Sequence, residues 1–262
     1  MEEFTFKWQG AGFAIGDLQV PVPIVQGGMG IGVSGRRLAT AVANQGGVGV
    51  LSAVGLGYLG LPCEIEAQEG DSHNITMLRQ ELRKARQQTR GVLGVNIMVA
   101  IREFTETARA AIEEGADIIF AGAGLPLNLP ACLTERAKTK LVPIVSSAKA
   151  ARLIAKRWMS KYHYAPDAFV LEGPKAGGHL GFALEEIDHP DYQLEALLPQ
   201  VVKAAKEIGA EAGKSIPVIA AGGVYTGADI YNMQRLGADA VQMATRFVAT
   251  EECDAADAFK QA

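Results

Sequence analysis

Residues 217–226 read Pro217-Val218-Ile219-Ala220-Ala221-Gly222-Gly223-Val224-Tyr225-Thr226. The apolar run Pro217–Ala220 predicts a buried strand, and the two glycines that follow predict a tight turn. Thr226 is a suitable N-cap for a helix over residues 226–236, after which Ala240–Met243 predicts the next strand. Strands joined through helices cannot pair by tight antiparallel turns, so this stretch predicts a parallel sheet.

The same strand–helix unit recurs along the whole chain. Further strands are predicted at Ile24–Val25, Val48–Leu51, Val92–Ile97, Asp117–Phe120, Val142–Val145 and Ala168–Leu171. Helices are predicted at 34–45, 73–89, 102–114, 130–138, 147–162 and 194–210, with a last one beginning near Asp254. Eight such units predict an α/β protein, a closed (β/α)8 TIM barrel. An open doubly wound sheet is the alternative, which the lack of GxGxxG after the first strand disfavours.

Amphipathic periodicity and capping residues support the predicted helices. Phe104, Ala108, Ala111 and Ile112 form one apolar stripe of the helix at 102–114. Ser34 is the expected N-cap of the first helix.

Two inserts are longer than typical strand–helix loops. Residues 54–72 and 183–193 are expected to fold over the mouth at the carboxyl ends of the strands. No linker or composition shift divides residues 1–262, which predicts a single domain. The chain stops soon after the eighth strand, so a truncated C-terminus at Ala262 is left open.

Composition excludes several classes of partner. A net charge of −4 disfavours nucleic acid or an anionic membrane surface as the main partner.

The cysteines at 63, 132 and 253 are too widely spaced for a zinc site and fit a reducing cytoplasm. Residues 38–63 carry no formal charge, but their glycines favour a buried strand and loop over a membrane span. The acidic start Met1–Phe4 lacks the apolar region of a signal peptide. We therefore expect a cytoplasmic protein.

Two turns after neighbouring predicted strands together predict a phosphate site. Gly222-Gly223 follows the seventh predicted strand, and Ala244-Thr245 follows the eighth. Barrels commonly hold phosphate groups at these two positions, where glycine N–H groups approach the oxygens closely. The alternative is that Gly222-Gly223 is only a tight turn.

His179 is the candidate acid or base. It lies in Glu172-Gly173-Pro174-Lys175-Ala176-Gly177-Gly178-His179-Leu180-Gly181, a glycine-rich loop after the strand at 168–171. An imidazole titrates near neutral pH, and the glycines allow substrate and cofactor close to the backbone. A lone histidine is more often structural, so the interpretation of His179 as an acid or base depends on the flanking glycines. The other histidines are not spaced as metal ligands, and no metal site is predicted.

Two further segments place polar groups or glycines at the expected mouth. Gln26-Gly27-Gly28-Met29-Gly30 follows the first strand, and Asn96 ends the third. A buried amide at Asn96 needs partners, and a heteroaromatic ring edge would supply them, although a turn-forming asparagine is an equal alternative.

Together these motifs resemble the nitronate monooxygenase family, formerly called 2-nitropropane dioxygenases, and its relatives the FMN-dependent enoyl-ACP reductases. The resemblance runs from Pro23-Ile24-Val25-Gln26 through Gly94-Val95-Asn96-Ile97 and Ala176-Gly177-Gly178-His179-Leu180-Gly181 to Gln242-Met243-Ala244-Thr245-Arg246-Phe247. It implies a TIM barrel that binds FMN non-covalently at the carboxyl ends of the strands.

The resemblance also implies roles for individual residues, with His179 facing the substrate. The implied cofactor-binding residues are Gln26, Gly27, Gly28, Met29, Asn96, Glu172, Gly177, Gly178, Gly222, Gly223, Gln242, Met243, Ala244 and Thr245. Four positions depart from the nitronate-oxidising pattern. Gly27-Gly28 stands where Ala-Pro is frequent, Glu172 where glutamine is frequent, and Ala244 where glycine is more usual.

The implied activity is oxidation of a small nitronate by O2, giving a carbonyl compound and nitrite. The glycine pair and Glu172 look more like the reductase branch, so an NAD(P)H-dependent reductase of enoyl thioesters is the alternative. A flavin-binding subunit that is non-catalytic or depends on a partner is a third. A homodimer is left open.

Overall fold

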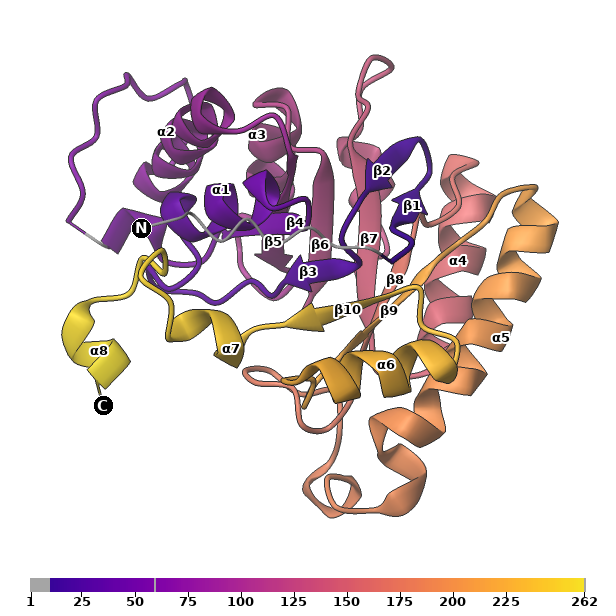
Figure 1. Ribbon diagram of the computed structural model, residues 1–262. Helices are drawn as coiled ribbons and strands as arrows, with labels where there is room; N and C mark the ends of the chain where they lie inside the picture. Colours follow the sequence, from indigo (N-terminus) through magenta and orange to yellow (C-terminus); the bar gives the residue numbers. More distant parts are fainter. Residues whose placement is uncertain (1–9, 59, 262) are drawn as a thin grey trace.

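Eight parallel strands close into a barrel in a computed structural model that describes residues 10–58 and 60–261 (Figure 1). Around the barrel the strand order is β10-β3-β4-β5-β6-β7-β8-β9. The bounds are β3 Ile24–Gln26, β4 Val48–Ser52, β5 Val92–Met98, β6 Ile118–Gly122, β7 Lys140–Val145, β8 Phe169–Glu172, β9 Val218–Ala221 and β10 Ala240–Met243. The predicted barrel and all eight predicted strands are confirmed.

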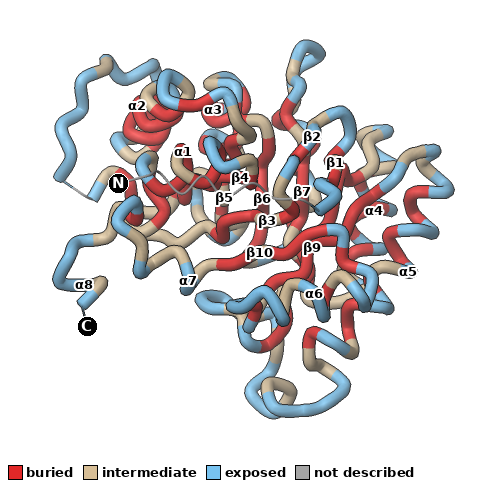
Figure 2. The backbone as a smooth tube through the Cα atoms, in the orientation of Figure 1, coloured by how far each residue is buried: buried red, intermediate tan, exposed pale blue. Residues whose placement is uncertain are grey.

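Helices surround the barrel, and the strands form its buried centre (Figure 2). The helices are α1 Arg36–Asn44, α2 His73–Gln88, α3 Phe104–Glu113, α4 Ala148–Tyr162, α5 Leu194–Ala212, α6 Gly227–Arg235, α7 Thr245–Val248 and α8 Asp257–Gln261. Thr226 caps α6 as expected, since its side chain accepts a hydrogen bond from the Asp229 amide. No helix among the described residues is both long and apolar enough to span a membrane.

The predicted helix at 130–138 and the predicted helix cap at Ser34 are wrong. The helix expected at 130–138 is only a 3₁₀ turn, η2 Leu129–Cys132. Pro130 fits the first turn, but Leu133 is extended and ends the element before an α-helix forms. Ser34 is not the N-cap of α1; Gly35 holds that position, and the Ser34 hydroxyl turns into the preceding loop.

Before the barrel, a two-stranded hairpin pairs β1 Phe13–Ile15 with β2 Leu18–Val20. The side chains of Phe13, Ile15 and Val20 join the apolar cluster that fills the barrel interior. Asp17 in the turn forms an ion pair with Lys140, the first residue of β7. The hairpin therefore closes the amino-terminal end of the barrel, which leaves the carboxyl end as the open mouth.

Part of the first insert, at 54–72, runs along the outer layer of helices. Its 3₁₀ turn η1 Leu56–Tyr58 follows β4 closely, but Pro62 and Glu64 hydrogen-bond to Gln80 in the middle of α2. The expectation is therefore wrong for this portion, because it runs along a helix of the outer layer.

The second insert, at 183–193, lies between β8 and α5. It carries two 3₁₀ turns, η3 Leu184–Glu186 and η4 Pro190–Tyr192.

The last segment returns to the start of the barrel. The last predicted helix begins three residues later than expected, since α8 starts at Asp257. The Asp254 carboxylate instead accepts hydrogen bonds from the backbone amides of Arg37 and Leu38, at 3.1 and 3.0 Å. It thereby satisfies free N–H groups at the amino end of α1. The acidic start Met1–Phe4 lies outside the described residues.

Candidate functional site

The residues predicted for the site gather at one end of the barrel. Gln26, Glu172 and Met243 are the last residues of β3, β8 and β10, and Gly222 directly follows β9. Asn96 lies near the carboxyl end of β5. All strands are parallel, so these positions surround the same mouth.

The loop between β3 and α1 packs tightly against two neighbouring strand ends. The Gly27 amide donates to the Met243 carbonyl at 2.7 Å. A β-carbon at Gly27 would lie 3.2 Å from Ala244 Cβ, and one at Gly28 would lie only 2.3 Å from Asn96 Cβ. The structure thus brings the glycine pair against Asn96 on one side and Met243–Ala244 on the other, with no space for larger residues at Gly28.

Gln26 is turned away from the mouth. Its side chain is fully buried, and its Nε2 donates to the Gly27 carbonyl at 2.7 Å and to Ser34 Oγ at 2.8 Å. Its Oε1 accepts from the Val50 amide at 2.9 Å. The hydrogen bonds of this side-chain amide are therefore made to the β3–α1 loop and to β4. Ser34, which sequence reasoning treated only as a cap, is part of this arrangement.

The two turns after β9 and β10 have free donors. Gly222 and Gly223 adopt left-handed backbone conformations, with φ of +100° and +78°. Within the described chain, the N–H groups of Gly222, Gly223 and Ala244 donate no hydrogen bond. Ala244 itself has φ of −125°, outside the left-handed region that favours glycine. Clustered free amides at glycine turns suit an anion, so these residues fit a phosphate group.

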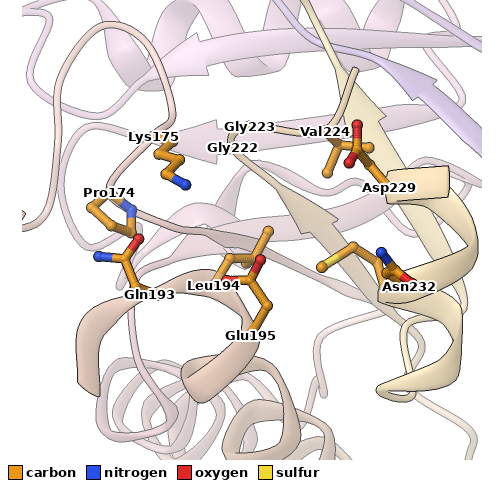
Figure 3. Close-up of a pocket in the computed structure, with 11 residues that line it drawn as sticks. Pro174, Lys175, Gln193, Leu194, Glu195, Gly222, Gly223, Val224, Asp229 and Asn232 are labelled. Carbon is orange, nitrogen blue, oxygen red and sulfur yellow. The ribbon is translucent and has the colours of Figure 1, made fainter. Parts of the chain in front are cut away.

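Beside the glycine pair lies a small cavity of about 60 Å³ between the β8–α5 loop and α6 (Figure 3). Lys175 reaches over the glycines, since a β-carbon at Gly223 would lie 3.1 Å from Lys175 Cδ. Nearby, the guanidinium of Arg246 lies 5.0 Å from the ring centre of Tyr225, which links the β10 and β9 turns. Both cations lie within the sequence motifs that indicated the site, but sequence reasoning did not single them out.

Glu172 carries an unusual carboxyl group. Burial raises the pKa of Glu172 to about 7 from an ordinary value of 4.5. No hydrogen bond or ion pair to its carboxylate occurs within the described residues. Its backbone pairs with Ala221 of β9, so the group lies next to the glycine turn. At neutral pH, a large fraction of this carboxyl is protonated and can donate a hydrogen bond.

His179 lies on an exposed part of the same loop. Gly177 and Gly178 before it have open space where a β-carbon would be, and Gly178 has φ of +86°. The Ser146 hydroxyl, at the carboxyl end of β7, donates to the Gly181 carbonyl at 3.3 Å. The structure therefore places His179 on the mouth side, but it forms no hydrogen bond or ion pair there with Asn96 or with the glycine turns. In the described part of the chain, no group of acidic, histidine and cysteine side chains is arranged to hold a metal ion.

Comparison with known proteins identifies the family. The family model described as nitronate monooxygenase matches residues 13–262. The chain belongs to the nitronate monooxygenase family. The expected resemblance to this family is therefore confirmed.

Several members of the family and solved structures are similar to the chain. A "(3aS,4S,5R,7aS)-5-hydroxy-7a-methyl-1-oxo-octahydro-1H-indene-4-carboxyl-CoA dehydrogenase" of Mycobacterium tuberculosis is 30% identical over 91% of this chain and 56% of its own length. A probable nitronate monooxygenase of Staphylococcus aureus is 26% identical, over 94% of this chain and 70% of the relative. The chain thus spans little more than half of the dehydrogenase.

Two solved structures share the fold at similar identity. FabK from Thermotoga maritima has a TM-score of 0.70 at 30% identity, covering 92% of this chain and 64% of that protein. A nitroalkane oxidase from Streptomyces ansochromogenes has a TM-score of 0.68 at 27% identity, covering 92% and 70%.

Proposed function

We propose that this chain binds FMN at the mouth of its barrel and is an oxidoreductase of the nitronate monooxygenase type. The observation that carries the proposal is the pair of turns after β9 and β10, whose free N–H groups at Gly222, Gly223 and Ala244 suit a phosphate. The Thr245 hydroxyl adds a donor to the same group.

The other mouth residues would lie along the rest of the flavin. Met29, Gly28 and Asn96 would line one side of the ring, with Glu172, Gly177 and Gly178 on the other. Gln242 and Met243, at the end of β10, would lie beneath the ribityl chain and phosphate. Glycine or a small residue is suited to these turns, because a flat ring approaches the backbone closely.

In this proposal the substrate is an alkyl nitronate. Bound FMN would supply the redox chemistry, passing electrons from the substrate to O2 as the nitronate becomes a carbonyl compound and nitrite. His179 would remove the proton from a neutral nitroalkane and attract the anionic nitronate once protonated. Its exposed position on a glycine-rich loop allows a substrate to reach it.

Thioester redox chemistry with NAD(P)H is the second candidate, and two observations favour it. The half-buried Glu172 supplies a carboxyl that titrates near pH 7, where the nitronate-oxidising pattern has a permanently neutral amide. The dehydrogenase relative of Mycobacterium tuberculosis acts on a carboxyl-CoA by its name, and FabK is equally similar in sequence.

Anaerobic mixing separates the candidates. The purified protein, loaded with FMN, is mixed with propyl-2-nitronate and separately with NADPH, and flavin absorbance is followed. Bleaching by nitronate alone supports the proposal, whereas bleaching by NADPH alone moves the chain to the thioester reductases. If neither propyl-2-nitronate nor NADPH changes the flavin absorbance, the chain is a flavin-binding subunit that is non-catalytic or depends on a partner. His179→Ala should retain FMN and lose turnover of neutral nitroalkanes.

A further inference from the structure

Ser34 is the centre of a buried hydrogen-bond network under the β3–α1 loop. Its side chain is almost fully buried, and its Oγ accepts from the Met29 amide and from Gln26 Nε2, both at 2.8 Å. The same hydroxyl donates to the Gly27 carbonyl at 3.1 Å. One side chain therefore holds the peptide groups on both sides of Gly28.

Gln26 connects this network to the barrel wall. β3 pairs with β4 at a single register position, Val25 with Val48, so few main-chain bonds join the two strands. The Gln26 side chain adds to them by accepting from the Val50 amide. The Ser52 amide donates to the Ser34 carbonyl at 3.0 Å, which fixes the far end of the loop to the same strand.

These bonds use alternate amides of the loop. Gly27, Met29 and Ile31 donate to Met243, Ser34 and Val54. Within the described chain, the Gly28 and Gly30 amides donate to nothing. The network thus fixes the backbone while it leaves two donors at the mouth without partners.

We infer that Gln26 and Ser34 are positioning residues for the flavin site. They hold the loop so that the free amides of Gly28 and Gly30 and the side chain of Asn96, packed against Gly28, form one wall of the mouth. Gln26 acts through Ser34 and Val50, because its side-chain hydrogen bonds all go to the protein's own groups. This inference rests on the proposed function, because it assigns the wall to a flavin.

A matched pair of variants tests the inference. Ser34→Ala removes the network hydroxyl, and Thr139→Val removes a buried hydroxyl that donates to the Ala116 carbonyl at 2.8 Å, next to the amino end of β7. Titration with FMN should give about tenfold weaker binding for Ser34→Ala, because the variant loses all three hydrogen bonds that fix the peptide groups around Gly28. Thr139→Val should bind within about twofold of the wild type at a comparable loss of Tm. Equal FMN affinities in the two variants would overturn the inference.

A second measurement needs neither a variant nor a flavin. Hydrogen exchange of the flavin-free wild type should show the Met29 amide strongly protected and the Gly30 amide exchanging fast. Equal fast exchange at both positions contradicts the inference. If the wild type shows this protection but binds no flavin, the proposed function fails while the network stands. If it binds FMN but Met29 is unprotected, the inference alone fails.

Discussion

The Glu172 carboxyl makes the stability of the barrel depend on pH. Burial raises its pKa from 4.5 to about 7, so the folded state binds more protons than the unfolded chain between these values. Stability is therefore highest below the unfolded pKa and is lost as pH rises through 7. We expect Glu172→Gln to exceed the wild type in stability at pH 8, by roughly 3 kcal/mol at most, and to match it near pH 4. Urea unfolding of the flavin-free proteins measures both differences.

Glu207 provides a control of opposite sign. A hydrogen bond from Arg152 lowers the pKa of this exposed carboxyl, so its contribution to stability is present at high pH and lost in acid. Glu207→Gln should therefore gain nothing at pH 8. A gain of the same size in both variants would mean that loss of any negative charge, rather than burial of Glu172, explains the effect.

Gly28 should reject even the smallest side chain. Its φ is outside the left-handed region, so the backbone itself permits alanine, but the added carbon would lie 2.3 Å from Asn96 Cβ. We expect Gly28→Ala to destabilise the protein by about 1–3 kcal/mol, as overpacking generally does. Adding Asn96→Gly should restore most of this loss, a coupling that a double-mutant cycle in urea measures.

Gly177→Ala is the matched control for that steric effect. A β-carbon at Gly177 meets no atom within 4 Å, so this substitution should leave the free energy of unfolding nearly unchanged. Additive effects of Gly28→Ala and Asn96→Gly would show that the contact with Asn96 is not the cause.

Sequence reasoning located the mouth residues but not which way they face. Position after a parallel strand identifies the end of the barrel, and this placed Glu172, Asn96 and Gly222 correctly. The direction of Gln26 depends on Ser34 and Val50, partners whose proximity only the closed barrel creates. The pKa of Glu172 likewise depends on burial by surrounding elements, which a single sequence does not reveal.

At the scale of the element, the β1–β2 hairpin is expected to stabilise the barrel without affecting the mouth. Ile15 is fully buried within the barrel cluster, so Ile15→Ala should cost about 2–5 kcal/mol. Because the hairpin closes the opposite end, FMN affinity should stay within about twofold of wild type. Urea unfolding measures the loss of stability, and FMN titration measures the affinity. Gln19→Ala, an exposed position on β2, should change neither, and weaker FMN binding by Ile15→Ala would show coupling between the two ends.

The errors in the sequence-based prediction of helices, strands and caps had different physical causes. The hairpin has a recognisable signal, two short strands around Gly16-Asp17, a pair suited to a two-residue turn. The α-helix expected at 130–138 failed because apolar spacing alone does not detect an early end at Leu133. The cap on α1 was missed since Asp254 is far away in sequence and comes close only when the barrel closes.

The whole molecule combines a closed amino end with an open carboxyl end. At the amino end, the hairpin and the apolar cluster form a closed interior. At the carboxyl end, the turns after β9 and β10 leave N–H groups without hydrogen-bond partners among the described residues. Unpaired backbone donors are costly where water is excluded, so a ligand that supplies acceptors should stabilise the entire fold.

Binding of FMN should therefore raise the Tm of the whole barrel, and the phosphate should account for most of the rise. A ligand at a hundred times its Kd stabilises the native state by about 2.7 kcal/mol, which is a shift of roughly 5–11 °C for a domain of this size. Riboflavin carries the same ring and ribityl chain without the phosphate that Gly222, Gly223 and Ala244 are proposed to bind. At equal concentration it should give a clearly smaller shift in differential scanning fluorimetry. Identical shifts for the two flavins would remove the phosphate from the site and, with it, the observation on which the assignment of FMN depends.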